Sequence, residues 1–258
     1  MPLYLSSLTQ NIIGVYRGMI LAWFATNFMV GNFTIALNFD FATLILLLTG
    51  PITTALFPAF SKLNPLGEEM RRMVKYAVKY TATLIIPASA FVIVMAKDLV
   101  SIIYGSSYTL APELLSVYCI AFLYAGLGSV MWGSFFNGIS ETKVNLKSTL
   151  IYATFFIPLA FLLAQSYNVL GLMLAMLLSS LASLIYILQI ATRKFNLSID
   201  KESALKIYIA SAVSAMPVPP LAYLSPLPSL INLIIGATCY ASIYLTIMPI
   251  IGGLPGRH

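Results

Sequence analysis

Long stretches without a charged side chain dominate this sequence and decide what it can fold into. Between the charged clusters lie apolar windows of about 20 residues, which match a hydrocarbon layer roughly 30 Å thick at about 1.5 Å per helical residue. Hydrophobic residues make up 60% of the chain and charged residues 9%, whereas a soluble domain is about 45–50% apolar. Strict alternation of apolar and polar residues is absent, so helices must satisfy the backbone in lipid. We therefore expect an all-α, polytopic membrane protein.

About eight windows are candidate transmembrane helices. They cover residues 8–28, 33–60, 76–96, 113–137, 149–166, 170–192, 205–224 and 229–250. The second window is long enough to be tilted or broken, and Gly50-Pro51 in its middle offers a break point.

The basic residues predict the orientation of these spans, because loops rich in Lys and Arg stay cytoplasmic. All Lys and Arg residues except Arg17 and Lys97 would lie on one side of the eight spans. Both termini are therefore expected in the cytoplasm, with the chain as a multi-pass protein of the cell membrane. The same loops account for the net charge of +6, so we expect contact with anionic lipid in the bilayer and no nucleic-acid partner.

The residue types that catalytic and metal sites need are scarce. The one histidine is His258, and the sequence has no Cys/His/carboxylate cluster with metal spacing and no nucleotide-binding motif. Cys119 and Cys239 fall within expected spans, where they are interpreted as packing residues. The longest hydrophilic stretches, 61–75 and 193–204, are too short for a catalytic domain. We expect neither an enzyme nor a cofactor or metal site.

Two charged residues, Arg17 and Asp40, lie inside expected spans. At about 1.5 Å per residue they are about 16 Å and about 12 Å from the outer ends of their helices, which the short connection from Asn27 to Asn32 makes antiparallel neighbours. An arginine at mid-membrane costs roughly 2.5 to 3.5 kcal/mol or more unless it meets a partner, a water-filled cavity or an anionic ligand. Two interpretations stay open: an internal ion pair of Arg17 with Asp40, or a cavity in which these residues contact an anionic substrate.

A stripe of cations with a spacing of four residues, Arg71, Lys75 and Lys79, lies on one face of a helix that enters the membrane. These side chains are candidates for contact with substrate or lipid phosphates on the cytoplasmic side. The alternative is that they are anchors whose ammonium and guanidinium groups reach out of the hydrocarbon.

Short motifs follow one another in the order found in a known family. They are Val30-Gly31-Asn32-Phe33-Thr34-Ile35-Ala36, Leu56-Phe57-Pro58-Ala59-Phe60-Ser61-Lys62-Leu63, Ile103-Tyr104-Gly105 with Tyr108 and Ala111, Asn137-Gly138 with Thr142-Lys143, and Leu170-Gly171-Leu172. In this order they resemble the later helices and connections of polysaccharide flippases of the multidrug/oligosaccharidyl-lipid/polysaccharide exporter superfamily. The resemblance covers residues 1 to about 192.

Members of that superfamily usually have fourteen helices, arranged as two six-helix lobes plus two C-terminal helices. The resemblance therefore implies a C-terminal half, helices seven to fourteen, with residues 1–192 as the second lobe and residues 193–258 as the two additional helices. The family's cavity lies between the lobes, so this chain would supply one wall of it. A separately encoded N-terminal lobe is then a candidate partner.

Three functional hypotheses follow. The first is a flippase or exporter of an anionic lipid-linked saccharide. Because flippases of such substrates resemble one another in having cations in the cavity, Arg17 is the matching candidate for the substrate pyrophosphate. The second is half of a drug or cation antiporter, in which Asp40 would exchange H⁺ or Na⁺. The third is a non-transporting remnant or membrane scaffold in which the Arg17–Asp40 pair is purely structural.

Overall fold

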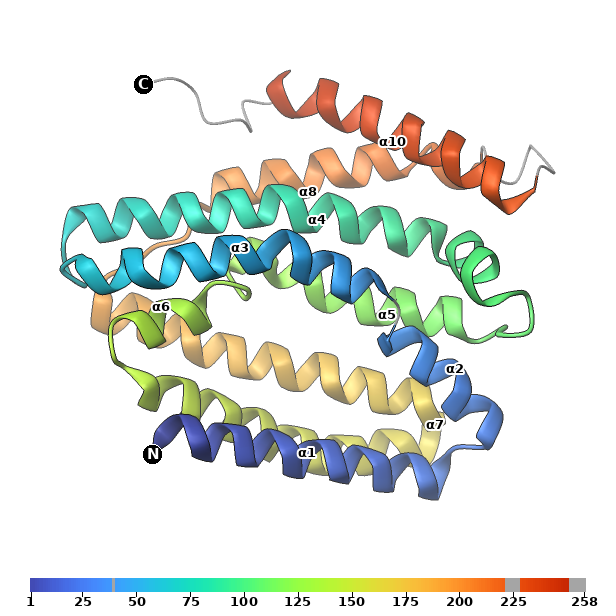
Figure 1. Cartoon of the computed structure of the whole chain (residues 1–258), viewed down its shortest axis with the longest axis horizontal. Helices are drawn as coiled ribbons and strands as arrows, with labels where there is room; N and C mark the ends of the chain where they lie inside the picture. The colour runs from blue at the N-terminus through green and yellow to red at the C-terminus, as the bar shows by residue number, and fades with distance from the viewer. Residues whose placement is uncertain (39, 221–227, 251–258) are drawn as a thin grey trace.

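In the computed structural model, the chain is a stack of helices lying roughly side by side (Figure 1). The structure describes residues 1–38, 40–220 and 228–250, and the side chains of 40–49 and 53 lie outside the described set. The elements are α1 (Pro2–Phe24), α2 (Asn27–Asn38), α3 (Asp40–Lys62), α4 (Glu68–Tyr104), α5 (Ala111–Leu123), the 3-10 helix η1 (Tyr124–Leu127), α6 (Trp132–Gly138), α7 (Thr142–Phe195), α8 (Lys201–Ala215) and α10 (Ser229–Ile250). Every regular element within these ranges is helical, which confirms the predicted all-α class.

The second expected window, 33–60, is divided between two helices. α2 ends at Asn38 and α3 begins at Asp40, and α3 is helical through Gly50 and Pro51. The predicted break at Gly50-Pro51 is therefore wrong. A proline removes one backbone hydrogen bond, and in a membrane helix its neighbours can compensate for that loss without ending the helix.

The fourth expected window, 113–137, is bent in its middle. α5 continues into η1, and this segment and α6 are inclined by 47°. Gly128 lies between them with a φ of 76°, and a Cβ there would lie 2.8 Å from Trp132 Nε1. The indole N–H donates to the Leu127 carbonyl at 2.8 Å. Because only glycine takes this conformation without strain beside a bulky ring, Gly128 determines where the helix bends.

α7 folds back on itself at Asn168, whose φ of 51° and ψ of −129° are not helical. The hydroxyl oxygens of Ser148 and Ser183 are 2.7 Å apart, whereas in one straight helix these residues would be about 50 Å apart. A Cβ on Gly171 would lie 2.0 Å from the Leu163 carbonyl oxygen, so the two arms touch at the turn. The arms, 142–167 and 169–195, contain the expected windows 149–166 and 170–192 (Figure 1).

The helices pack in neighbouring pairs. α1 lies along α7, α3 contacts α6 and α4, and α2 contacts α5, while α8 and α10 contact α4 and each other. Among the described residues, α4, α7 and α10 are each long and apolar enough to cross a membrane, and the bent segment Ala111–Gly138 adds a fourth candidate. The count of eight spans and the cytoplasmic position of both termini stay predictions.

Segments that belong to separate sequence motifs meet in the structure. Asn32 is 1% exposed, and its Oδ1 accepts hydrogen bonds from the backbone N–H groups of Leu110 and Ala111 at 3.1 and 2.9 Å, at the start of α5. A Cβ on Gly138 would lie 2.9 Å from the Cβ of Phe60. These motifs therefore contain the contact points that join α2 to α5 and α3 to α6.

Candidate functional site

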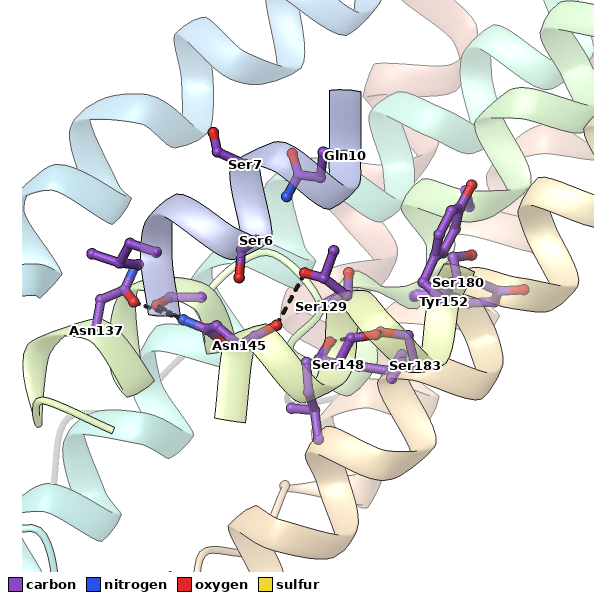
Figure 2. Close-up of a pocket in the computed structure, with 17 residues that line it drawn as sticks. Ser6, Ser7, Gln10, Ser129, Asn137, Asn145, Ser148, Tyr152, Ser180 and Ser183 are labelled. Carbon is purple, nitrogen blue, oxygen red and sulfur yellow. Dashed lines mark hydrogen bonds between the residues drawn. The ribbon is translucent and has the colours of Figure 1, made fainter. Parts of the chain in front are cut away.

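A cavity of about 530 Å³ opens between α1, α6 and both arms of α7. Hydroxyl and amide side chains make up most of its lining, and Figure 2 shows them converging from these three helices. The lining consists of Leu3, Ser6, Ser7, Gln10, Ala121, Tyr124, Ser129, Gly133, Asn137, Asn145, Ser148, Thr149, Tyr152, Ser180, Ser183, Leu184 and Ile187. None of these residues is Asp, Glu, Lys, Arg or His, and we call the space the polar cavity.

Hydrogen bonds between helices hold the polar lining in place. Asn145 Nδ2 donates to Asn137 Oδ1 at 2.8 Å and to the Gly133 carbonyl at 3.1 Å, which ties α7 to α6. The Ser183 hydroxyl donates to the Ser148 carbonyl at 3.1 Å, which ties the two arms of α7. Ser6 Oγ on α1 is buried and has no hydrogen-bond partner among the described residues. The lining therefore combines polar groups that are fixed by hydrogen bonds with others, such as the Ser6 hydroxyl, that are not.

Two smaller cavities continue the polar cavity, and all three meet at Tyr152. One, of about 290 Å³, reaches Ile13 on α1. The other, of about 170 Å³, is lined by Tyr118, Met173 and Met176 as well. The lining thus changes from hydroxyls and amides around Ser6 and Asn145 to tyrosine and methionine around Tyr118 and Met173.

Arg17 lies next along the face of α1 that borders these cavities. Ser6, Gln10, Ile13 and Arg17 fall within one narrow stripe of a helix with 100° per residue. The Arg17 side chain is half-buried. Within the part of the chain that the structure describes, Arg17 has no hydrogen bond or ion pair. A guanidinium here has donors left for an anion.

Asp40, the other charged residue predicted to lie inside a span, is the first residue of α3. Its side chain lies outside the described residues, and the predicted ion pair between Asp40 and Arg17 therefore lies outside them as well. α1 packs along α7, and α3 packs on α6 and α4.

The predicted cation stripe is only partly brought together. Arg71 and Lys75 line a separate cavity of about 390 Å³ with Arg72, Glu68, Asn196 and Ser198, and we call this space the basic pocket. Arg71 Nη1 is 2.5 Å from Glu68 Oε1. Lys79 is not part of this lining.

The Asp200 carboxylate offsets part of the positive charge of the basic pocket. It caps α8, where its carboxylate accepts from the Ser203 N–H at 3.0 Å and from the Ser203 hydroxyl at 2.7 Å. These bonds hold the pKa of Asp200 below its ordinary value, and the charges of Lys79 and Lys75 act in the same direction. Among the described residues, no group of three or more His, Cys, Asp or Glu is placed to hold a metal ion.

Sequence reasoning missed most of the polar cavity. Single Ser, Thr, Asn and Gln residues are ordinary in membrane helices, so their presence alone indicates no site. One usable signal was the spacing of Gln10 and Arg17, which puts two polar side chains on one face of an apolar helix. Arg72 was missed because it falls outside the spacing of four, and the loop at Asn196 and Ser198 brings it into the basic pocket.

Comparison with known proteins supports the resemblance seen in the motifs. The family model described as "Polysaccharide biosynthesis protein" matches residues 1–113. A putative O-antigen transporter from Shigella dysenteriae is 24% identical over 189 residues, which are 73% of this chain and 46% of that protein. The solved structure of the lipid II flippase MurJ in an inward closed conformation superposes with a TM-score of 0.75 at 16% identity, over 96% of this chain and 52% of that chain.

These matches confirm the resemblance to polysaccharide and lipid-linked saccharide flippases, and the fold is that of the lipid II flippase. The chain spans about half the length of both relatives. The relatives are a transporter and a flippase rather than enzymes.

Proposed function

We propose that this chain is half of a flippase that moves a lipid-linked polysaccharide precursor across the cell membrane. The polar cavity contacts the saccharide, and Arg17 contacts the phosphates that link it to the lipid. Residues 1–192 form a six-helix lobe and residues 193–258 two additional helices, with the other wall of the transport cavity supplied by a second lobe. The likeness to an O-antigen transporter and a lipid II flippase supports the substrate class.

The observation behind this proposal is the chemistry of the polar cavity. Saccharides present many hydroxyls that both donate and accept, and the hydroxyls and amides from α1, α6 and α7 do the same. Because the lining is uncharged, a neutral saccharide does not have to displace water from buried ions. Transporters of this kind place substrates between two halves, where polar backbone and side chains line a water-filled space.

Arg17 suits the phosphate end of such a substrate. Its guanidinium has a planar set of donors that matches two phosphate oxygens at once. It lies beyond Gln10 and Ile13 on the cavity-facing stripe of α1, about 10 Å along the helix from Gln10. A substrate with its saccharide in the polar cavity would thus have its phosphates near Arg17 and Tyr152.

The test is translocation of a fluorescent polyprenyl-pyrophosphate saccharide in liposomes. The chain is reconstituted alone and with an N-terminal lobe encoded beside it, and translocation is expected only with the partner lobe. Arg17→Ala should lower the initial rate by roughly 10- to 100-fold, because a charge-assisted hydrogen bond contributes about 1.5–3 kcal/mol. Arg17→Lys should recover part of the rate, since the charge remains but the planar fork is lost.

The matched control is Arg193→Ala, which removes an exposed arginine in the last turn of α7. It should leave the rate within about twofold of the parent. Equal losses for Arg17→Ala and Arg193→Ala would reject the role of Arg17. No translocation by folded, inserted protein in either preparation would favour the remnant or scaffold hypothesis. Transport of small cations or drugs that depends on pH and stops with Asp40→Asn would favour the antiporter.

A further inference from the structure

A groove of about 600 Å³ runs between η1, the second arm of α7 and α8, and we call it the apolar groove. Leu127, Ile185, Leu188 and Leu205 give it hydrocarbon walls, and Ile185 and Leu205 are 47% and 60% exposed. α7 and α8 make few contacts with each other, since α8 packs on α4 and α10. Within the described residues, the groove therefore separates two helices whose facing apolar side chains are only partly covered by protein.

The deep end of the apolar groove is closed by Tyr208 and Gly126. The Tyr208 hydroxyl donates to the Leu123 carbonyl, and a Cβ on Gly126 would lie 2.5 Å from that hydroxyl oxygen. At the other end, Lys201 lies about 10 Å along α8 from Tyr208, and Thr192 lies about 10 Å along α7 from Ile185. The groove thus runs inward from a polar mouth.

The apolar groove and the basic pocket meet at Ser198, which lines both. The loop that contains Ser198 is held at both ends. Asn196 takes a left-handed conformation with φ 51°, and the Leu197 N–H donates to the Ala191 carbonyl at 3.0 Å. Asp200 caps α8 on the other side. The Ser198 side chain therefore lies between the three cations of the basic pocket and the apolar groove.

The cations of the basic pocket are not all neutralised within the protein. Glu68 engages only Arg71, and Arg71 Nε is buried with no partner among the described residues. Arg72 and Lys75 are exposed, and no hydrogen bond or ion pair involves either of them in the described part of the chain. The pocket therefore has donors and net positive charge available for an anion.

The depth of these cations matches a lipid headgroup. Residues 80–96 of α4 contain no Lys, Arg, Asp or Glu and, at about 1.5 Å per residue, span about 25 Å of hydrocarbon. Lys75 and Arg71 lie one and two turns beyond Lys79, which marks the edge of this stretch. An anion bound there would lie at the level of lipid phosphates rather than in bulk water.

We propose that an anionic phospholipid binds where α4, α7 and α8 meet, with its phosphate against Arg71, Arg72 and Lys75 and one acyl chain in the apolar groove. This site is separate from the polar cavity. On the second arm of α7 the cavity is lined by Ser180, Ser183, Leu184 and Ile187, whereas the groove is lined by Ile185, Leu188, Gln189 and Thr192. At 100° per residue the mean directions of the two sets are roughly 140° apart. The bound lipid fills the space between α7 and α8 and does not occupy the transport route.

The experiment titrates the purified full chain with dioleoyl phosphatidylglycerol or dioleoyl phosphatidylcholine and measures the Kd of the first bound lipid by native mass spectrometry. Phosphatidylglycerol is expected to bind roughly tenfold or more tightly, because each basic residue near a lipid phosphate contributes about 1 kcal/mol. The variant R72Q/K75Q should lose this preference and still unfold at the parental temperature without lipid. It leaves the Arg71–Glu68 pair intact.

The matched control is K143Q/K147Q, which removes two exposed lysines near the start of α7. It should change the Kd for phosphatidylglycerol by less than about twofold, and an equal loss in both double variants would reject a built site in favour of diffuse attraction. Leu205→Trp, which narrows the groove without changing charge, should weaken binding of the same lipid several-fold. Unchanged binding in R72Q/K75Q or in Leu205→Trp would overturn the proposal. So would inorganic phosphate that raises the unfolding temperature as much as phosphatidylglycerol does, because the occupant would then be a soluble anion.

Discussion

Around the second arm of α7, one face borders the polar cavity and another borders the apolar groove. The first face presents Ser180 and Ser183 among hydroxyls and amides, and the second presents Ile185 and Leu188 to the apolar groove. Both faces are built on one helix within a single apolar stretch of sequence. The difference shows that in this protein polarity without charge lies inside the helix bundle, while charge is concentrated at its end.

A physical reason separates these two chemistries. A buried ion without a partner costs several kcal/mol in a medium of low dielectric constant, whereas a hydroxyl in a helix can bond to its own backbone when no ligand is present. Ser180 does so, donating to the Leu177 carbonyl at 2.8 Å. Cations at the headgroup level keep water and lipid phosphates as partners. Arg17 is the exception on the cavity side, and this makes it informative.

The largest effect is expected from a substitution that prevents the two arms of α7 from packing, because both faces depend on that packing. Gly171→Ala would place a Cβ about 2.0 Å from the Leu163 carbonyl oxygen, so the two arms of α7 could not close at Asn168. We expect a loss of about 4 kcal/mol or more, enough to abolish folding. Size-exclusion chromatography of a fluorescent fusion in detergent should show no monodisperse peak.

The control for this change is Gly14→Ala on α1, where a Cβ would meet nothing within 4 Å. That variant should elute like the parent. A folded Gly171→Ala protein would mean that the close approach of the arms is not required.

The second prediction introduces a carboxylate into the polar cavity in one variant and at the mouth of the apolar groove in another. Thr149→Asp introduces a carboxylate into the polar cavity, and saccharide translocation should fall by roughly tenfold or more because of desolvation and repulsion of phosphate. Thr149→Val, of similar shape, should cost far less. Thr192→Asp puts the same charge at the mouth of the apolar groove and should weaken phosphatidylglycerol binding while leaving translocation within about twofold. If each substitution impaired both activities equally, the two faces would not be functionally distinct.

The helices could be predicted from the sequence because the hydrocarbon layer imposes one rule on every span. Apolar windows identified the segments of α4, the arms of α7 and α10, since length and hydropathy alone decide that. The break in the second window was placed at Gly50-Pro51 because proline is a local signal. The bends at Gly128 and Asn168 involve close approaches of Gly128 to Trp132 and of Gly171 to Leu163, and neither bend contains a proline that would mark it in the sequence.

The motifs and the sites were predictable to different degrees. Asn32 and Gly138 belong to motifs seen in the sequence, and each makes a close contact between helices in the structure. Arg17 stood out since a lone cation in an apolar window is costly. The polar cavity could not be derived, because its lining comes from helices whose pairing the sequence does not state. The basic pocket was half found, since Arg71 and Lys75 share a helix face and Arg72 depends on a loop from α7.

The smallest effect is expected from a substitution in the loop between α7 and α8. Asp200→Ala removes the cap that accepts from Ser203, and it should lower the free energy of unfolding by about 1 kcal/mol at pH 7. Since the folded pKa of Asp200 is lowered from 3.8, the stabilisation is present above the unfolded pKa and is lost as the pH falls through the folded value. Thermal unfolding in detergent should therefore separate parent and variant at pH 7 and bring them together as the pH falls through the lowered pKa of folded Asp200. Asp200→Asn, which keeps a capping oxygen, should lie near the parent at pH 7. Because residues of this loop line the basic pocket and the apolar groove and none of them lines the polar cavity, Asp200→Ala should leave saccharide translocation unchanged. A variant that lost translocation instead would show that the loop controls the polar cavity across α7, and the two faces would then have to be treated as one site.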